Sequence, residues 1–179
     1  EYNGARYCGW QTQPNSKKKS IQEVIEAALY RIFGRKVKLV VSGRTDAGVH
    51  ALGQVANFHI DSDISFDRLK LGLNGLLPRD IKVSSVTQVP GVFHSRFSSK
   101  SKHYRYTILN RAHSSPLREG KVFFYPHKLN LRLMRSEAKA LLGKHDFSSF
   151  RASLGKDKAP VKEIKMLSIS RSRDCVNID

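Results

Sequence analysis

The sequence predicts an α+β fold made of two ferredoxin-like halves of the βαββαβ type, residues 1–90 and 91–179. Within 1–90, helical and strand patterns follow in the order helix, strand, strand, helix, strand. After Pro90 the strand pattern starts again. Hydrophobic residues make up 40% of the 179 residues, which is enough to bury a core. We therefore expect antiparallel sheets with helices packed on them in both halves.

The first helix begins at a capping box, Ser20 to Glu23. The Ser20 hydroxyl can accept from the amide of Glu23, and the Glu23 carboxylate can accept from the amide of Ser20. Gly34 is expected to close the helix in a left-handed conformation. The apolar stripe between these ends has helical spacing and consists of Ile21, Val24, Ile25, Ala28, Leu29 and Ile32.

The rest of the first half reads as strands around a second helix. Ser65 is the expected N-cap of that helix and Pro78 ends it. Its apolar stripe is Phe66, Leu69, Leu73, Leu76 and Leu77. The expected strands are the remains of one in 1–10, then 38–41, 54–60 with Ala56, Phe58 and Ile60 on one face, and 81–86. Residues 43–53 are expected to form a loop.

The second half repeats these patterns less completely. Tyr104, Tyr106 and Ile108 alternate as a strand and share one face, so at least one of the two tyrosines is expected to be buried. A helical stripe follows, formed by Leu131, Met134, Ala138, Leu141 and Leu142. Further strands are expected over 121–125, 161–170 and 175–179. We expect this half to be truncated before its last elements.

The charge balance points to an acidic partner. Lys and Arg total 32 against 15 Asp and Glu, a formal net charge of +17. Nucleic acid is the commonest partner of such a surface. A membrane surface is the weaker alternative, because the cations are spread over the chain instead of lying on one amphipathic helix, and no apolar run is long enough to span a bilayer. Two cysteines, Cys8 and Cys175, indicate a reducing compartment, so we expect a cytoplasmic protein.

The densest group of reactive side chains lies in 42–50. Glycines flank Asp46, and Arg44 could hold its carboxylate ionised, ready to act as a nucleophile or base. The alternative is that Asp46 caps its own turn. His50 and Asp46 are not expected to bind a metal, because their spacing would suit a helix. No phosphate-binding or serine-hydrolase motif is present.

A second group, in 96–106, interleaves cations with aromatic rings. Arg96 and Arg105 could contact phosphates while a tyrosine ring stacks on an unpaired base, a combination typical of proteins that bind single-stranded or looped RNA. From the residues alone, either Tyr104 or Tyr106 could equally belong to the core.

These motifs closely resemble the TruA family of tRNA pseudouridine synthases. The match includes Gly43-Arg44-Thr45-Asp46-Ala47-Gly48-Val49-His50 at every position, and it extends over nearly the whole chain. Further matching segments, in the same order, are Tyr2-Asn3-Gly4, Gly9-Trp10-Gln11, Ser20-Ile21-Gln22-Glu23, Asn74 with Leu77-Pro78, Phe93-His94-Ser95-Arg96-Phe97, Tyr104-Arg105-Tyr106 and Asp146-Phe147-Ser148-Ser149-Phe150.

The resemblance implies roles for individual residues. Asp46 would be the catalytic nucleophile that attacks the target uridine, and Arg44 would pair with Asp46 and help hold the uridine out of its stack. Tyr104 would pack on the target base, Arg96 and Arg105 would bind substrate, and Tyr106 would belong to the core. No metal or organic cofactor is expected.

The resemblance also implies a substrate and an assembly. The expected substrate is the anticodon stem-loop of tRNA, at about positions 38 to 40, bound in a cleft formed by the two sheets. Family members are homodimers in which one tRNA contacts both subunits. They also continue beyond the last residue matched here, into a segment that completes the catalytic cleft, so this chain is expected to be a shortened copy.

Two other functions stay open at this point. A non-catalytic RNA-binding module of ferredoxin-like fold would have the same charge and aromatics, but it would not need an Arg-x-Asp in a glycine-bounded loop. A small hydrolase using Asp46 and His50 would need a nucleophilic Ser or Cys nearby, and the sequence offers none.

Overall fold

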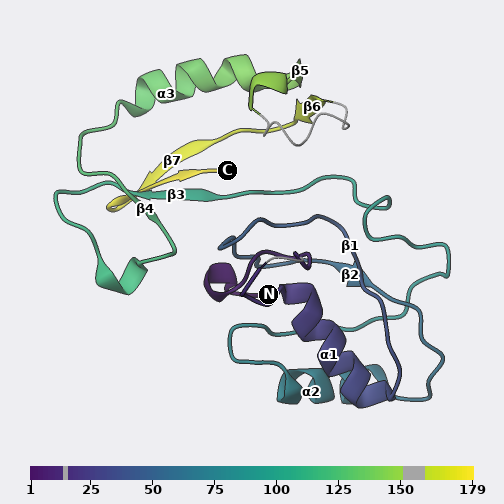
Figure 1. The fold of residues 1–179 in the computed structure, drawn as a ribbon. Coiled ribbons are helices and arrows are strands. Elements are labelled where there is room, and N and C mark those ends of the chain that lie inside the picture. The colour runs from purple at the N-terminus through teal and green to yellow at the C-terminus, as the bar shows by residue number, and fades with distance from the viewer. Residues whose placement is uncertain (14–15, 151–159) are drawn as a thin grey trace. The chain divides into compact units, whose positions relative to one another are not determined.

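A computed structural model describes residues 1–13, 16–150 and 160–179 (Figure 1). The chain folds into two compact units, Glu1–Ser101 and Lys102–Asp179, each described here by itself. Helices and small sheets occur in both units, which confirms the α+β class. No helix among the described residues is long and apolar enough to cross a membrane.

Both helices of the first unit begin and end close to where the sequence predicts. Helix α1, Ile21–Phe33, begins at the complete capping box of Ser20 and ends at Gly34, whose φ of 68° is left-handed. Helix α2, Phe66–Leu76, begins at Ser65, whose side chain makes no capping hydrogen bond, and ends just before Pro78. The two helices lie next to each other on one side of the small sheet (Figure 1).

The sheet of the first unit is shorter than the sequence predicts. Strand β1, Val40–Val41, pairs antiparallel with β2, Ala56–Asn57. Tyr2 forms isolated antiparallel bridges to Ala51 on one side and to Ile81 on the other. The prediction of a strand over 81–86 is therefore wrong beyond this one bridge.

An open groove lies along the segments beyond the ends of these strands. Residues 52–64 and 81–91 line much of an open groove of about 1330 Å³ in the first unit. Glu1 exchanges two hydrogen bonds with Lys82, its amino group donating over 2.8 Å and its carbonyl accepting over 2.9 Å. Because a strand needs a neighbour for its donors and acceptors, the predicted strand segments that lie farther along the groove stay irregular.

The core of the first unit joins the N-terminal segment, both helices and the sheet. Its most deeply buried members are Trp10, Ile21, Leu29, Leu73 and Ile81, each at most 3% exposed. Ala56, Phe58 and Ile60 pack against this core as predicted. Phe66 departs from the expected stripe, because at the first turn of α2 it is 47% exposed.

The second unit contains a four-stranded sheet of order β4-β3-β8-β7. Strand β3, Tyr106–Leu109, lies between β4, Phe123–Phe124, and β8, Cys175–Ile178, and β7, Ile169–Ser172, pairs with β8. The pairs β3–β8 and β7–β8 are antiparallel, whereas β3–β4 is parallel. The expectation of purely antiparallel sheets is thus wrong for β4.

A second pair of strands replaces the single strand predicted over 161–170. Strand β6, Val161–Ile164, pairs antiparallel with β5, Gly143–Asp146, and the chain then leaves this pair before β7 begins. Sequence patterns missed β5, because its Gly-Lys-His-Asp sequence is polar and exposed throughout. Such a strand is formed by backbone pairing alone, with no buried face to mark it.

Helix α3, Leu131–Ala138, begins at Asn130, whose side chain accepts from the amide of Leu133. A 3-10 turn, Lys139–Leu141, continues it, so the α-helix ends earlier than the predicted stripe. Figure 1 shows α3 beside β7, and the Arg135 side chain donates to the Ile169 carbonyl over 2.8 Å.

The buried residues of the second unit correct one prediction. Ile108, Leu109 and Val176 are buried in the sheet, but Tyr106 is 54% exposed. Tyr106 lies beyond the point where β4 pairs with β3, and its ring packs loosely beside that of Phe123, with 6.2 Å between the centroids. Its assignment to the core is wrong.

Candidate active site

The loop between β1 and β2 presents the predicted reactive residues to solvent. We call residues 42–50 the signature loop. Asp46 and Arg44 are both exposed, and the Asp46 carbonyl accepts from the Val49 amide over 3.2 Å to form a turn. In the part of the chain that the structure describes, the Asp46 carboxylate makes no hydrogen bond or ion pair. The predicted pair with Arg44 is thus not formed in this structure, nor is the alternative turn cap.

The N-terminal segment Tyr2–Trp10 is hydrogen-bonded to this loop at Thr45 and to the residue directly after it, Ala51. Tyr2 and Ala51 exchange two backbone hydrogen bonds of 2.8 and 3.0 Å. Eight residues later, the Trp10 amide donates to the Thr45 carbonyl over 2.9 Å, directly before Asp46. The Tyr2 and Thr45 hydroxyls are 2.8 Å apart and hydrogen-bonded. Asp46 is therefore exposed on a loop whose backbone is fixed, as a positioned reactive group requires.

Two glycines allow this close contact. A Cβ on Gly4 would collide with the carbonyl oxygen of Val49. A Cβ on Gly9 would lie 2.6 Å from the Thr45 carbonyl oxygen, and the φ of Gly9 is 104°, which favours glycine. The spacing Tyr2-Asn3-Gly4 and Gly9-Trp10-Gln11 therefore has a physical basis: each glycine lets the backbone pass against the signature loop.

Side chains add a second layer of contacts around the loop. The Gly4 amide donates to His50 Nδ1 over 3.1 Å. Gln54 Nε2 donates to the Gly43 carbonyl over 2.7 Å, while its Oε1 accepts from the Ser42 hydroxyl over 2.9 Å. Sequence reasoning did not assign Gln54. The signal was weak, since Gln54 is one of three polar residues in the predicted strand over 54–60, beside Asn57 and His59.

Arg96 belongs to the first unit, like Asp46. It lies on an exposed turn, and its guanidinium carbon is 5.6 Å from the centroid of the Phe97 ring, which is 76% exposed. The neighbouring Ser95 is buried and ties this turn to the sheet, its amide donating to Asn57 and its hydroxyl to the Val40 carbonyl. A cation and a ring are thus presented together on a fixed segment.

Tyr104 and Arg105 belong to the second unit. Tyr104 is 64% exposed, so its ring is accessible. Arg105 Nε lies 2.7 Å from Asp179 Oδ1, and His103 Nε2 lies 2.9 Å from the same oxygen. The hydrogen bond from Arg105, with that from His103, lowers the pKa of Asp179 below its usual value, against the opposing effect of burial. Sequence reasoning did not foresee that Arg105 already has a carboxylate partner.

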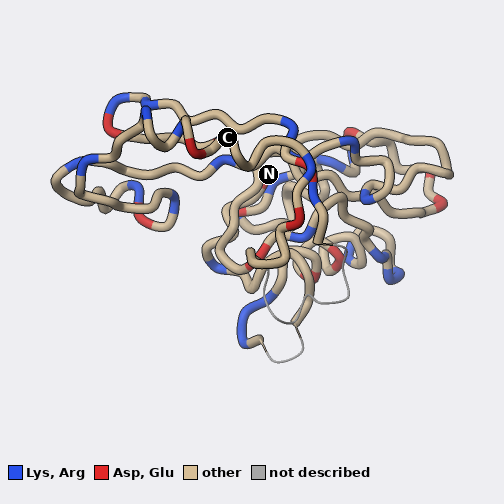
Figure 2. The backbone as a smooth tube through the Cα atoms, turned by 90° about the horizontal axis from the view of Figure 1, so that it is seen from above, with Lys and Arg blue, Asp and Glu red and all other residues tan. Residues whose placement is uncertain are grey.

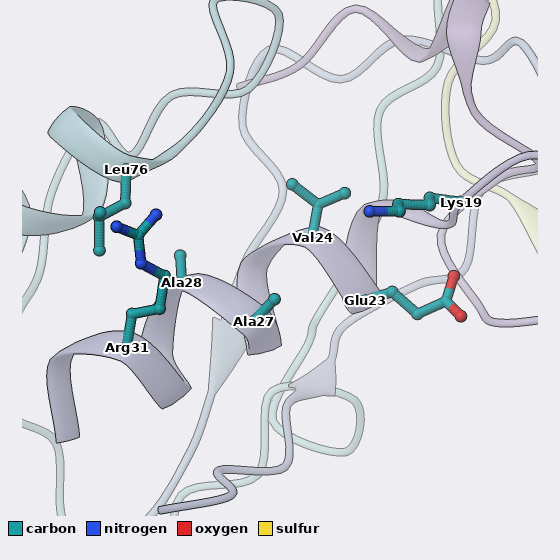
Figure 3. A pocket seen from close by; sticks show the side chains of 7 residues that line it. All are labelled: Lys19, Glu23, Val24, Ala27, Ala28, Arg31 and Leu76. Atoms are coloured by element: carbon teal, nitrogen blue, oxygen red, sulfur yellow. The ribbon is translucent and has the colours of Figure 1, made fainter. Parts of the chain in front are cut away.

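The cavities do not coincide with the signature loop. A pocket of about 270 Å³ lies between α1 and the end of α2 (Figure 3). Its lining consists of Lys19, Glu23, Val24, Ala27, Ala28, Arg31 and Leu76. The lining of the larger groove includes Leu52 and the residues after it, but none of the described residues of the signature loop. A reactive loop that is exposed and rigid suits a macromolecular substrate better than a small molecule, which would need an enclosing pocket.

The distribution of charge fits a polyanionic substrate. Figure 2 shows Lys and Arg recurring along the traces of both units, with far fewer Asp and Glu. Among the described residues, no group of three or more His, Cys, Asp or Glu side chains is placed to hold a metal ion. An exposed carboxylate on a fixed loop, together with cations on both units, is the arrangement expected of the class of RNA-modifying enzymes.

Comparison with known proteins identifies the family. The sequence model of the tRNA pseudouridine synthase family matches residues 1–98. Over its whole length, the chain is 44% identical to tRNA pseudouridine synthase A of Geotalea daltonii, and the aligned region covers 72% of that protein. It is also 44% identical to the Citrifermentans bemidjiense protein of the same name, covering 71% of it, and 39% identical to that of Thermoanaerobacter sp. strain X514, covering 72%.

The chain belongs to the tRNA pseudouridine synthase family. It is an isomerase that acts on tRNA and converts uridine to pseudouridine.

Proposed function

We propose that Asp46 is the nucleophile of this isomerisation and that Arg44 is its partner on the signature loop. In the reaction, the bond from the ribose C1′ to N1 of uracil breaks and a bond from C1′ to C5 forms, while C5 loses a proton and N1 gains one. The atoms balance without any co-reactant. The chemistry needs a carboxylate that can attack and later leave.

The observation that carries this proposal is the combination of exposure and fixation at Asp46. Its carboxylate is exposed, with no hydrogen-bonding partner among the described residues, while the carbonyl of the residue before it is held by Trp10. A carboxylate that served only as a cap would be bonded to its own backbone. We propose that in the complex with RNA Arg44 pairs with Asp46 and helps hold the target uridine out of its stack.

Contacts with the rest of the RNA are assigned to exposed aromatics and cations. We propose that Tyr104 packs on the target base and that Arg96 and Arg105 contact the RNA, Arg96 together with the Phe97 ring. Stacking and charge are both available at these positions, since Tyr104 and Phe97 are more than half exposed. The ion pair with Asp179 holds Arg105 in one orientation before RNA binds.

The finer description of substrate and assembly is also a proposal. We propose that the target uridines lie in the anticodon stem-loop, at about positions 38 to 40, that the enzyme works as a homodimer in the cytoplasm, and that it uses no metal or organic cofactor. The excess of cations over both units supports a long RNA contact. Both cysteines are free thiols, which suits a reducing compartment.

We propose that 1–90 and 91–179 correspond to two ferredoxin-like halves whose sheets form the RNA-binding cleft. In the first unit, Ile81, Tyr2 and Ala51 follow one another in antiparallel bridges, and β2 pairs antiparallel with β1 beyond them. That gives the order fourth, first, third, second for the strand positions of a βαββαβ unit. The bridges support this assignment for the first half.

An Asp46→Asn variant tests the nucleophile. Asn keeps the shape of the side chain but cannot attack as a carboxylate, so pseudouridine formation in unmodified tRNA should fall by several orders of magnitude. Mapping pseudouridine along the anticodon arm tests the proposed positions in the same experiment. Product formed by the variant at the wild-type rate would overturn the assignment, and no product from the wild type would favour a binding module.

A further inference from the structure

A partly buried carboxylate outside the signature loop binds several residues of the segment that supports that loop. Asp80 follows Pro78 at the end of α2, and its side chain is only 13% exposed. Tyr7 donates from its hydroxyl to Asp80 Oδ1 over 2.7 Å. Arg6 approaches Asp80 Oδ2 with two nitrogens, at 2.6 and 2.8 Å. In addition, the Asn3 amide donates to the Asp80 carbonyl over 2.8 Å.

The pKa values of this cluster agree with its geometry. Burial raises the pKa of Tyr7 to about 12, helped by the hydrogen bond to Asp80. Burial acts to raise the pKa of Asp80 too, but the hydrogen bonds from Tyr7 and Arg6 outweigh it and lower that pKa. The carboxylate therefore stays ionised and the phenol stays protonated around neutral pH, so titration does not break these contacts there.

Asp80 binds residues at both ends of the 3-10 turn Gly4–Arg6, which touches the signature loop. They are Asn3 before the turn and Arg6 and Tyr7 at its end. Gly4 lies against the Val49 carbonyl, closer than any residue with a Cβ could, and its amide donates to His50 Nδ1. One side of this short turn is thus fixed by Asp80, and the other side carries the end of the loop. A shift of the turn would move Val49 and His50 with it.

We propose that Asp80 is a positioning residue for the isomerisation: by holding the turn Gly4–Arg6 through Arg6 and Tyr7, it sets the position of the signature loop that carries Asp46. This inference rests on the proposed function, because it assumes that the reacting group is on that loop. The expected effect is on kcat more than on RNA affinity, since both oxygens of the Asp80 carboxylate are already bonded to Arg6 and Tyr7.

An Asp80→Asn variant of the full chain tests the proposal. Asn can still accept from Tyr7 but loses the ion pair to Arg6. We expect kcat to fall about tenfold or more, with KM for tRNA within about twofold of wild type, because a misplacement of about 1 Å is costly to catalysis. Tyr7→Phe, which removes one hydrogen bond, should lower kcat less.

Trp10 supplies a spectroscopic readout that a purely structural role would not move. It is the only tryptophan of the chain, it is 2% exposed, and its amide is bonded to Thr45. If Asp80→Asn displaces the segment Tyr2–Trp10, the emission of Trp10 should shift to longer wavelength while circular dichroism still shows a folded protein. Leu73→Ala is the control for a loss of stability alone, since Leu73 belongs to α2 and is 3% exposed in the core.

The comparison is made at a temperature where all variants are folded. Leu73→Ala should then keep its kcat, although it loses stability. The proposal is overturned if Asp80→Asn keeps kcat within twofold, if its Trp10 emission is unchanged, or if Leu73→Ala loses kcat equally. Should Asp80→Asn not fold, Tyr7→Phe and Arg6→Met must each lower kcat with KM unchanged, or the proposal fails.

The two proposals fail separately. A wild-type rate for Asp46→Asn would remove the nucleophile assignment, whatever Asp80→Asn does. A normal kcat and Trp10 emission in Asp80→Asn would remove the positioning role, even if Asp46 proves essential.

Discussion

Trp10 and Thr45 are joined by a backbone hydrogen bond of 2.9 Å, although they are 35 residues apart in the chain. The Thr45 carbonyl is the last backbone group before Asp46, so this bond fixes the peptide that leads into the reactive residue. The contact depends on Gly9, whose positive φ brings Trp10 against the loop.

Replacing Gly9 by Ala should therefore damage both stability and catalysis. The new Cβ would meet the Thr45 carbonyl at 2.6 Å in a conformation that favours glycine, and we expect a loss of about 2 kcal/mol in the free energy of unfolding. Urea unfolding and pseudouridine formation measure the two effects. Gly53→Ala is the control: a Cβ there meets no atom within 4 Å, so little change is expected.

The two serines at the helix starts, Ser20 and Ser65, should contribute differently to the free energy of unfolding. The Ser20 hydroxyl accepts from the Glu23 amide over 3.1 Å, whereas the Ser65 side chain makes no capping bond. Ser20→Ala should lower the free energy of unfolding by about 1 kcal/mol, and Ser65→Ala by clearly less. Equal losses in chemical denaturation would contradict the importance of the capping box.

Affinity for tRNA should fall steeply as salt concentration rises, because each phosphate contact releases counterions. Arg96→Gln should reduce the slope of log K against log salt by about one, while Arg96→Lys should keep the slope. Filter binding or fluorescence anisotropy over a series of salt concentrations provides the measurement. A flat salt dependence of the wild type would contradict the proposed phosphate contacts.

The stability of the second unit should depend on pH through Asp179. Its folded pKa is lowered, chiefly by the hydrogen bond from Arg105, so its contribution is present above the unfolded pKa and is lost as pH falls through the folded pKa. Asp179→Asn removes this contribution. Wild type should thus be more stable than the variant at neutral pH, and the difference should vanish in acid; a difference independent of pH would refute the assignment.

The sequence was sufficient where local chemistry decides structure. The capping box at Ser20, the left-handed Gly34 and the stop before Pro78 all depend on neighbours within a few residues, and all are present. The loop that carries Arg44 and Asp46 was predicted from its glycines, and it lies between β1 and β2 as expected.

The sequence was insufficient where structure depends on distant partners. Within the strand expected over 81–86, the described residues form a bridge at Ile81 alone. Strand β5 has no apolar face, so no hydrophobic pattern marks it in the sequence. Tyr106 alternates correctly with Ile108 but extends past its neighbouring strand. The support of the signature loop by Asp80 and Gln54 joins residues far apart in the chain, which no local pattern records.

The hold of Tyr2–Trp10 on the signature loop also has a consequence for the order of folding. The loop's bonds to this segment span some 35 to 49 residues, so we expect them to form later than the local hydrogen bonds of α1. During synthesis the segment Tyr2–Trp10 emerges before the signature loop, so its hydrogen bonds to the loop cannot form until the loop has been made. Enzymatic activity on refolding should then return together with the native emission of Trp10, and later than the helical signal.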